Sequence, residues 1–471
     1  MRRAIQLGFL ALYGCATAPG YRSSSVRPPS SFREDPHPLT PSPSGRGGTQ
    51  DEPAVSSAYW DQLGDTTLTR LVGEVLRGNL DVRSARARVS AARSDRVRSV
   101  LDLTPSATLQ AGYSRQRLSS ASFPGAFGVF PDQNVWDAGA NASWDLDLFG
   151  GIRHTVQARG ALADVAQEDL RNVQVTLTAE VARAYFELRG AQEQLDVARR
   201  NAENQRRTFD LTKQRLDAGR GSSFDTERAQ AQLSSTLASI PAREAQVAAA
   251  QYRIGTLVGR APTEVARELE QIGQLPRLPE VTSIGAPETV VRYRPDVASA
   301  ERFAAAQGAL VGAAKASYLP RLTIGGSVGY AAPDFNSVGN QGTLRYVVGP
   351  VLTWPGLNLG RVKAEVDAAA AREDAARAQY GRVVLAAMEE METSLARYRA
   401  ARLQVERLED ASAASERAAE LARMRFREGV TDFLQVLDAE RTELEAQDRL
   451  AQSRIDAATA YAALYKAAGG Q

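Results

Sequence analysis

Four segments of the chain alternate apolar and polar residues with a period of two. The first two run over residues 106–114 and 136–147, and the other two over 322–330 and 344–354. Roughly ten residues of alternation with aromatic residues near the ends is typical of membrane-spanning barrel strands. These aromatic residues are Tyr113, Trp136, Trp144, Tyr330, Tyr346 and Trp354. Two ordinary hairpins in a soluble α+β protein would alternate in the same way, so the pattern alone leaves both interpretations open.

The rest of the sequence has the spacing of long paired helices. Residues 151–216 contain no proline, and at about 1.5 Å per residue they predict roughly 90–100 Å of helix. Apolar residues recur at heptad spacing, and mainly small residues lie four positions before them. The two series are Val181, Leu188, Leu195, Ala202, Phe209 and Leu216, and Leu177, Ala184, Ala191 and Ala198. A coiled-coil scaffold would have the same heptads, so this periodicity does not by itself predict a channel.

Both long helices are predicted to end in a tight turn. Gly219 and Gly429 stand where a left-handed cap is needed. Capping-box-like residues then open the next helices. These residues are Ser222 and Asp225 in the first case, and Asp432 and Gln435 in the second. Each pair of helices is therefore predicted to form a hairpin with a tight tip.

The sequence is duplicated. Residues 79–105 correspond to 294–320 without a gap, and further on Trp144 corresponds to Trp354 and Gly219 to Gly429. We expect one domain over residues 59–471, made of a first repeat at about 59–280 and a second at about 281–471. The predicted fold is mainly α with a small membrane β part. Four strands cannot close a barrel alone, and an open edge is not tolerated in lipid, so other subunits must complete the sheet. A pore favours a trimer with twelve strands over a dimer with eight.

The N-terminus has the features of a secretory signal. Arg2 and Arg3 precede a short apolar stretch, and Cys15 follows it. Residues 12–15 resemble a bacterial lipobox, in which Cys15 becomes the acylated N-terminus, although Tyr13 replaces the usual small residue. An ordinary signal peptide with an incidental cysteine is the alternative. Residues 16–58 are rich in proline and serine and predict a tether.

Composition restricts the remaining chemistry. The chain has 471 residues, a formal net charge of +2, one cysteine and two histidines. These counts exclude internal disulfides and cysteine-cluster metal sites, and we expect no metal or cofactor. Residues after 15 contain no uncharged apolar run long enough for a spanning helix. An arginine-rich helix at 83–98 is interleaved with aspartates, which favours a solvated face over a nucleic-acid site. The glutamates at 389–392 lack catalytic companions and are interpreted as a solvated helix face, so no enzymatic activity is predicted.

Taken together, these motifs resemble outer-membrane efflux channels of the TolC/OprM type, in the lipoprotein branch called NodT-like. The resemblance is carried by Cys15, residues 144–150, residues 294–320 and the tips around Gly219 and Gly429. It implies a trimer whose twelve-stranded β-barrel in the outer membrane is continued by a twelve-helix α-barrel across the periplasm. It further implies the exit duct of a tripartite pump, docked to a periplasmic adaptor protein and an inner-membrane transporter of the RND type.

The resemblance also implies roles for individual residues. Leu434 and Asp438 match the family's closed aperture, and their spacing puts them on one helix face. Asp225 is the corresponding acidic residue of the first tip. Gly219 and Gly429 would be adaptor-docking points. The simpler interpretations are a solvated carboxylate at Asp438, an acidic residue favoured by the helix dipole at Asp225, and helix capping alone at the two glycines.

Two other functions remain open at this stage. An outer-membrane channel for type I protein secretion would share the fold. A secreted coiled-coil scaffold lipoprotein would share the heptads but would need neither a pore nor lipid-facing strands. The sequence does not identify the exported substrate.

Overall fold

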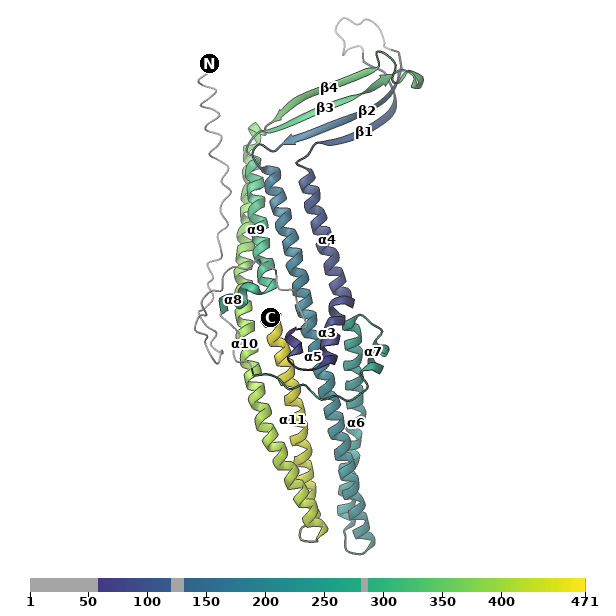
Figure 1. Ribbon diagram of the computed structural model, residues 1–471, viewed down its shortest axis with the longest axis vertical. Helices are drawn as coiled ribbons and strands as arrows, with labels where there is room; N and C mark the ends of the chain where they lie inside the picture. The colour runs from purple at the N-terminus through teal and green to yellow at the C-terminus, as the bar shows by residue number, and fades with distance from the viewer. Residues whose placement is uncertain (1–57, 120–130, 281–286, 471) are drawn as a thin grey trace. The chain divides into compact units, whose positions relative to one another are not determined.

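A computed structural model describes residues 58–119, 131–280 and 287–470. The described chain is mainly helical, with one four-stranded sheet (Figure 1). Cys15, the predicted signal peptide and residues 16–57 of the predicted tether lie outside the described residues. No helix within the described ranges is both long enough and apolar enough to cross a membrane.

The two repeats share a succession of one helix, two strands and two long helices, to which each adds short helices of its own. The first consists of α2 (Ala58–Asp61), α3 (Thr66–Gly78), α4 (Leu80–Leu101), β1 (Ser106–Gln116), β2 (Gln133–Leu146), α5 (Gly151–Asp217), α6 (Ser223–Val258) and α7 (Pro262–Glu268). The second consists of α8 (Pro287–Tyr293), α9 (Pro295–Ala316), β3 (Arg321–Ala332), η3 (Phe335–Ser337), β4 (Leu344–Thr353), η4 (Gly356–Asn358), α10 (Leu359–Arg427) and α11 (Phe433–Ala467). The four predicted strands and the long predicted helices are confirmed, with ends that differ by a few residues.

The chain divides into two compact units that cut across the repeats. The sheet unit contains the described residues of 88–167 and 299–381, and the hairpin unit contains those of 58–87, 168–298 and 382–470. Each unit therefore takes corresponding segments from both repeats.

The sheet unit shows the duplication in its hydrogen bonds. The sheet is antiparallel in the order β1-β2-β3-β4. Trp144 Nε1 donates to the carbonyl oxygen of Leu103 at 2.9 Å, and Trp354 Nε1 donates to that of Tyr318 at 3.1 Å. Leu103 stands two residues before Pro105, which directly precedes β1. Tyr318 stands two residues before Pro320, which directly precedes β3. Equivalent tryptophans thus hold equivalent turns in the two repeats.

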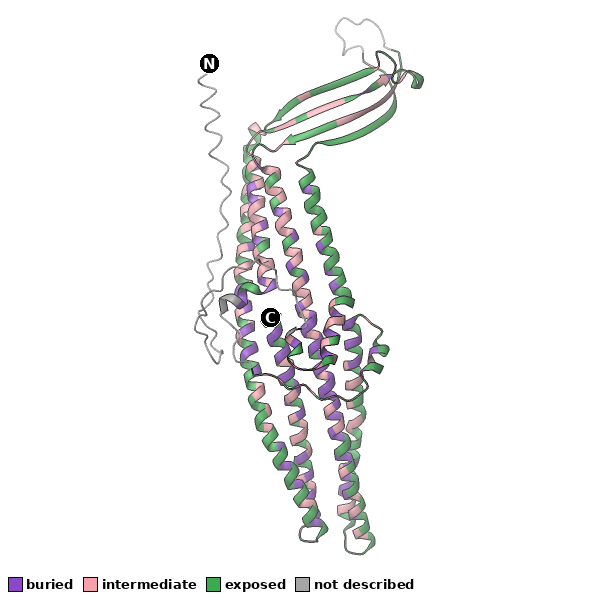
Figure 2. Ribbon diagram, in the orientation of Figure 1, coloured by how far each residue is buried: buried purple, intermediate pink, exposed green. Residues whose placement is uncertain are grey.

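The hairpin unit buries the predicted heptad positions. Val181 and Leu188 are fully buried, and Met391 and Ala419 are fully buried at the corresponding seam of α10. Figure 2 shows buried residues following the helices of this unit in stripes, while other faces of the same helices are exposed. The short helix α2 is held by Trp60, which is fully buried and whose ring centroid lies 4.8 Å from that of Tyr465. Stripes of this kind stabilise long helices by packing rather than by intrinsic propensity.

Candidate functional site

The sheet has one apolar face and one polar face. Across the strands, Leu109 pairs with Ala140, which pairs with Val328, which pairs with Tyr346. The neighbouring row on the other face joins Thr108, Asn141, Ser327 and Val347. Because side chains alternate between faces along a strand, these rows extend over the whole sheet. Leu109 is 87% exposed and Tyr346 is 77% exposed, so no part of the chain that the structure describes covers the apolar face.

Most of the predicted interface aromatics lie near the two ends of this apolar face. At one end the rings of Tyr113 and Trp136 lie 4.6 Å apart, and Phe335 packs on Trp136 at 5.3 Å. Tyr330 lies near this end, in register with Leu344. Trp144 and Trp354 stand at the opposite end. Tyr346 lies nearer the middle of the face, opposite Val328.

The polar face carries few charges. Arg345 of β4 forms an ion pair with Asp137 of β2 at 3.8 Å, across the intervening strand β3. Asp145 accepts a hydrogen bond from the Thr323 hydroxyl group. Small residues fill most of the remaining positions, and a Cβ atom at Gly139 would lie only 2.7 Å from the carbonyl oxygen of Val328. Water can therefore cover this face, and neighbouring strands lie close together at its glycines.

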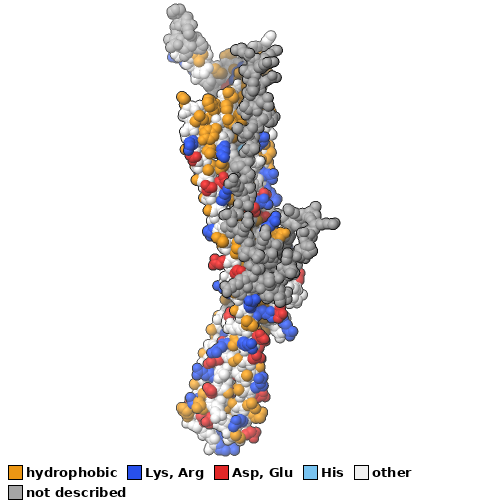
Figure 3. Space-filling view, turned by 90° about the vertical axis from the view of Figure 1, so that its left-hand side faces the viewer, with side chains coloured by type: hydrophobic (Ala, Val, Ile, Leu, Met, Phe, Trp, Pro, Cys, Tyr) orange, Lys and Arg blue, Asp and Glu red, His pale blue; other side chains and the backbone are white. Residues whose placement is uncertain are grey.

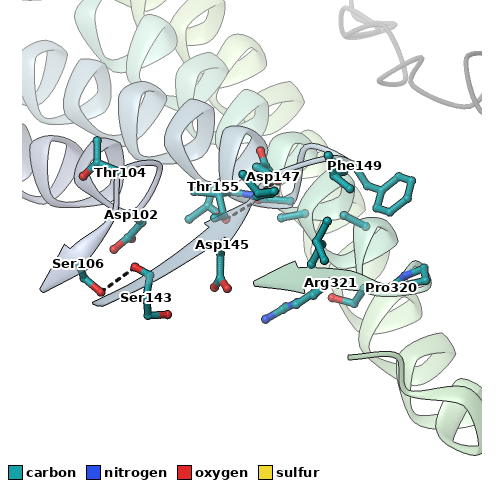
Figure 4. Close-up of a pocket in the computed structure, with 18 of the residues that line it drawn as sticks. Asp102, Thr104, Ser106, Ser143, Asp145, Asp147, Phe149, Thr155, Pro320 and Arg321 are labelled. Carbon is teal, nitrogen blue, oxygen red and sulfur yellow. Dashed lines mark hydrogen bonds between the residues drawn. The ribbon is translucent and has the colours of Figure 1, made fainter. Parts of the chain in front are cut away.

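A cavity of about 560 Å³ lies where the helices meet the sheet (Figure 4). Asp102, Asp145 and Asp147 are among its lining residues. Asp147 accepts hydrogen bonds from the backbone N–H groups of Ile152 and Arg153 at 3.0 and 2.8 Å, so it caps the start of α5. The described residues contain no group of histidine, cysteine or acidic side chains that could hold a metal ion.

The hairpin unit ends in two matching tips. Gly219 has φ +68° and Gly429 has φ +74°, both in the left-handed region. Behind them the N–H of Arg220 donates to the carbonyl oxygen of Arg215, and the N–H of Val430 donates to that of Arg425, each at 2.9 Å. This is the Schellman arrangement, and it satisfies carbonyls that the helix end leaves without partners. The predicted left-handed caps are confirmed at both positions.

The next helices begin at the predicted caps. The Ser222 side chain accepts from the N–H of Phe224, and the Asp432 side chain accepts from that of Gln435. The Gln435 side chain is directed to the Thr431 hydroxyl group instead of returning to Asp432. The capping box predicted at Asp432 is therefore only half formed.

The candidate aperture residues are positioned by these tips. Leu434 lies in the first turn of α11 and is 51% exposed, and Asp438 lies one turn later and is also exposed. Asp225 is half-buried in the first turn of α6. Across the described ranges, no hydrogen bond or ion pair joins Asp225 to Asp438. Within one chain, α11 brings Leu434 and Asp438 together, and Asp225 remains apart from them.

Beneath the tips, an apolar cluster joins segments of both repeats. Ala229, Phe426, Phe433 and Val436 are buried together. Arg215 lies over the Phe426 ring at 4.5 Å and donates to the Phe426 carbonyl oxygen at 2.7 Å. Because the opposite face of α11 is buried in this cluster, the orientation of its exposed face is fixed.

A buried acidic cluster follows the aperture residues along α11. Glu440 and Glu443 are 4% and 3% exposed. Arg423 lies 3.5 Å from the Glu440 carboxylate and 3.2 Å from that of Glu443, and the Thr208 hydroxyl donates to Glu440 at 2.7 Å. Burial raises the pKa of both carboxyl groups, and the contacts with Thr208 and Arg423 only partly offset it. Sequence reasoning missed this cluster because its members are distant along the chain.

Comparison with known proteins places this geometry in context. The sequence matches the family described as "Outer membrane efflux protein" over residues 71–260 and 287–470. It is 29% identical over 467 residues to the pyoverdine export outer membrane protein OpmQ of Pseudomonas aeruginosa, covering 98% of this chain and 95% of that one. It is 26% identical over 465 residues to Nodulation protein T of Rhizobium leguminosarum bv. trifolii, with the same coverage.

Solved structures agree with the sequence relatives. The outer-membrane channel OprN superposes with a TM-score of 0.86 at 36% sequence identity, covering 97% of this chain and 99% of that chain. The Campylobacter jejuni outer membrane channel CmeC has the same TM-score at 20% identity, which is a likeness of fold.

Proposed function

This chain belongs to the outer membrane efflux protein family, and we propose that it is the outer-membrane exit duct of a tripartite efflux pump. In this role it conducts small molecules passively from the periplasm to the exterior. The observation that carries the proposal is the two-faced sheet. Its apolar face is unpartnered, its opposite face is polar, and it is joined to long helical hairpins. Relatives named as export proteins for pyoverdine, antibiotics and toluene support the efflux of organic compounds.

The duct is a homotrimer in this proposal. β1 and β4 are the outer strands of the sheet, and within residues 58–119, 131–280 and 287–470 each has a neighbouring strand on one side only. Unpaired backbone groups are costly in lipid, so β1 of one copy pairs with β4 of the next until the barrel closes. Three copies supply twelve strands, which is wide enough for a passage. The helices of three copies continue this passage as an α-barrel through the periplasm, where most of the mass lies.

The tips form the gate and the docking surface. Three copies of Leu434 and Asp438 give stacked apolar and anionic rings, with Asp225 as the acidic residue of the first tip. A periplasmic adaptor protein docks at the tips around Gly219 and Gly429, and an RND-type transporter in the inner membrane supplies the energy. Adaptor binding shifts an equilibrium from a closed tip to an open one, because it favours the open state.

Outer-membrane location follows the family, and Cys15 provides an additional lipid anchor in this proposal. Two acyl chains on the mature N-terminus would hold the tether at the membrane. Mass spectrometry of the mature N-terminus tests this directly. An N-terminal cysteine carrying acyl chains supports the anchor, and an unmodified N-terminus eliminates it.

Single-channel recording in a planar bilayer tests the function itself. The purified protein is expected to insert and give discrete conductance steps, without ATP or any other energy source. Absence of any pore would leave the secreted coiled-coil scaffold as the better explanation. Conductance accompanied by export of a polypeptide rather than small molecules in reconstituted cells would favour the type I secretion channel.

A further inference from the structure

Basic side chains gather at the ends of the helices that meet the sheet. α4 and α9 each have a basic residue in the last turn, and α5 and α10 have one at the third position. We call the following residues the basic belt: Arg98, Arg153, Lys315, Arg361 and Lys363. All are exposed, and Arg361 is the most exposed of those in ion pairs, at 83% of its side chain. All five belong to the sheet unit.

Three of the four ion pairs of the belt share one direction. Arg98 pairs with Asp95, which precedes it on α4 and is therefore farther from β1. Arg361 and Lys363 pair with acidic residues four positions later on α10, again farther from the strands. The fourth pair joins Arg153 to Asp147, which lies between β2 and α5, and Lys315 has no ion pair in the described parts of the chain. In the three pairs the positive end consequently faces the sheet.

At the start of α10, the position of the basic side chains is electrostatically unfavourable in water. A helix N-terminus carries a partial positive charge, so cations in the first turns are disfavoured there. α10 has no acidic residue in its first turn, but it has Arg361 and Lys363. The helices that begin at the tips are different, since α6 has Asp225 in its first turn and α11 is capped by Asp432. An anionic partner at the sheet end would remove this cost.

Exposed apolar side chains separate the belt from the sheet. Leu357 in η4 is fully exposed, Leu148 is 57% exposed, and Trp354 is 56% exposed. Figure 3 shows hydrophobic side chains gathered in one patch of the face in view, with basic and acidic side chains below it. The succession of apolar strands, tryptophan, leucine and then cations matches a lipid leaflet from its acyl chains to its headgroups.

We propose that the basic belt binds the anionic phosphate headgroups of the membrane leaflet around the helical end of the sheet. The proposal rests on the proposed function, because it requires the sheet to lie in a membrane. Guanidinium groups bind phosphate in a bidentate manner, and the exposed ion pairs of the belt exchange readily with a competing anion. Such contacts fix the depth at which the sheet sits in the membrane.

Brominated lipids test this with the chain's own tryptophans. The whole protein is reconstituted into vesicles that contain brominated phosphatidylglycerol or, at equal mole fraction, brominated phosphatidylcholine. Trp144 and Trp354 stand at the helical end of the sheet, and the measurement uses the Trp136→Phe protein because Trp136 stands at the other end. Trp60 is fully buried in the hairpin unit and gives a constant background. Quenching should give a preference for phosphatidylglycerol of roughly two- to threefold in relative association constant.

A triple variant isolates the belt. Lys315→Gln, Arg361→Gln and Lys363→Gln together should reduce the preference to about one. The matched control changes three exposed arginines of the hairpin unit on α5 and α10, with Arg200→Gln, Arg407→Gln and Arg417→Gln. The control should keep the native preference. Equal quenching by both lipids in the native protein, or an unchanged preference in the belt variant, overturns the proposal. If neither lipid quenches the tryptophans, the sheet is not in lipid, and the proposed function fails instead.

Discussion

Single glycines determine the shape of the tips. At Gly219 a Cβ atom would meet nothing within 4 Å, yet the residue has φ +68°. The effect of a side chain there is therefore purely conformational. Gly219→Ala should weaken the tip by about 1–2 kcal/mol, the cost of a left-handed L-residue.

Hydrogen exchange at the amide of Arg220, which closes the tip turn, measures this cost. Gly360→Ala is the control, because Gly360 also has open space but lies in α10 without a positive φ. That substitution should leave exchange at the tip unchanged. Equal exchange rates in native protein and Gly219→Ala would show that the turn does not depend on glycine.

The buried carboxyl groups of Glu440 and Glu443 predict how stability depends on pH. Burial raises the pKa of both groups, so the folded chain binds these protons more tightly than the unfolded chain. Their stabilising effect is full below the ordinary carboxyl pKa and is lost as the pH rises through the raised values. The thermal midpoint should fall over that range. Glu440→Gln should flatten the dependence, since an amide oxygen still accepts from Thr208.

Thermal unfolding across a pH series tests this, with Glu445→Gln as a control. Glu445 lies on the same helix, but its side chain is 48% exposed. A steeper pH dependence in Glu440→Gln than in the native protein would contradict the assignment to burial.

At this scale the sequence predicted what is local and missed what is distant. Gly219 and Gly429 were predictable because a helix end needs a left-handed residue within a few positions. The contact of Arg215 with Phe426 was not, because 211 positions separate them. Glu390 was interpreted as part of a solvated face, and its side chain is 35% exposed, but it also pairs at 2.6 Å with Arg294, whose side chain is 7% exposed. Nothing in the neighbourhood of either residue signals this pairing.

Among the elements, the sheet depends on two equivalent tryptophans. Replacing Trp144 or Trp354 with Phe removes one hydrogen bond to a backbone carbonyl at the turn into β1 or β3. Each replacement should cost about 1 kcal/mol. Because the repeats use the same bond, the two costs should be similar.

Denaturant unfolding in detergent compares the two variants. Trp136→Phe is the control, since Trp136 makes ring contacts with Tyr113 and Phe335 at the other end of the sheet. A large difference between Trp144→Phe and Trp354→Phe would show that the repeats are not equivalent in energy.

Helix α11 carries the proposed gate on its exposed face. Leu434→Ser with Asp438→Asn should raise single-channel conductance several-fold, because the change removes both the apolar and the anionic ring. The opposite face, with Phe433 and Val436, is buried and should keep the helix in place. Leu421→Ser with Glu420→Gln, at exposed positions within α10, serves as the control. Unchanged conductance in the Leu434 and Asp438 variant would locate the constriction elsewhere.

The elements themselves were largely predictable. Period-two alternation located all four strands, although β2 begins at Gln133, three residues before the alternation at Trp136. Two of these three residues, Gln133 and Asn134, are polar, and only pairing with β1 defines them as strand. The faces of the sheet followed from the alternation, whereas the cross-strand register of Leu109 with Ala140 required the structure.

At the scale of the whole molecule, the sheet leaves interactions open that the proposed trimer would supply. Both compact units combine segments of the two repeats, so neither repeat is a unit by itself. Among the described residues, the sheet has two outer strands unpaired on one side and an exposed apolar face, including Tyr346 and Val348 at 77% and 72%. In the proposed trimer, lipid covers the apolar face and neighbouring copies pair with the outer strands.

Closure by other copies therefore decides the oligomeric state. Eight strands would make a barrel filled by its own side chains, while twelve leave a passage. The polar face has an Asp137–Arg345 ion pair and many small residues, which suit a wet interior better than a packed one. Light scattering with the detergent subtracted should give a protein mass close to three chains of 50.7 kDa. A mass of two chains would leave no room for a duct and would exclude the trimer, while a single chain would leave the edges of the sheet without an explanation.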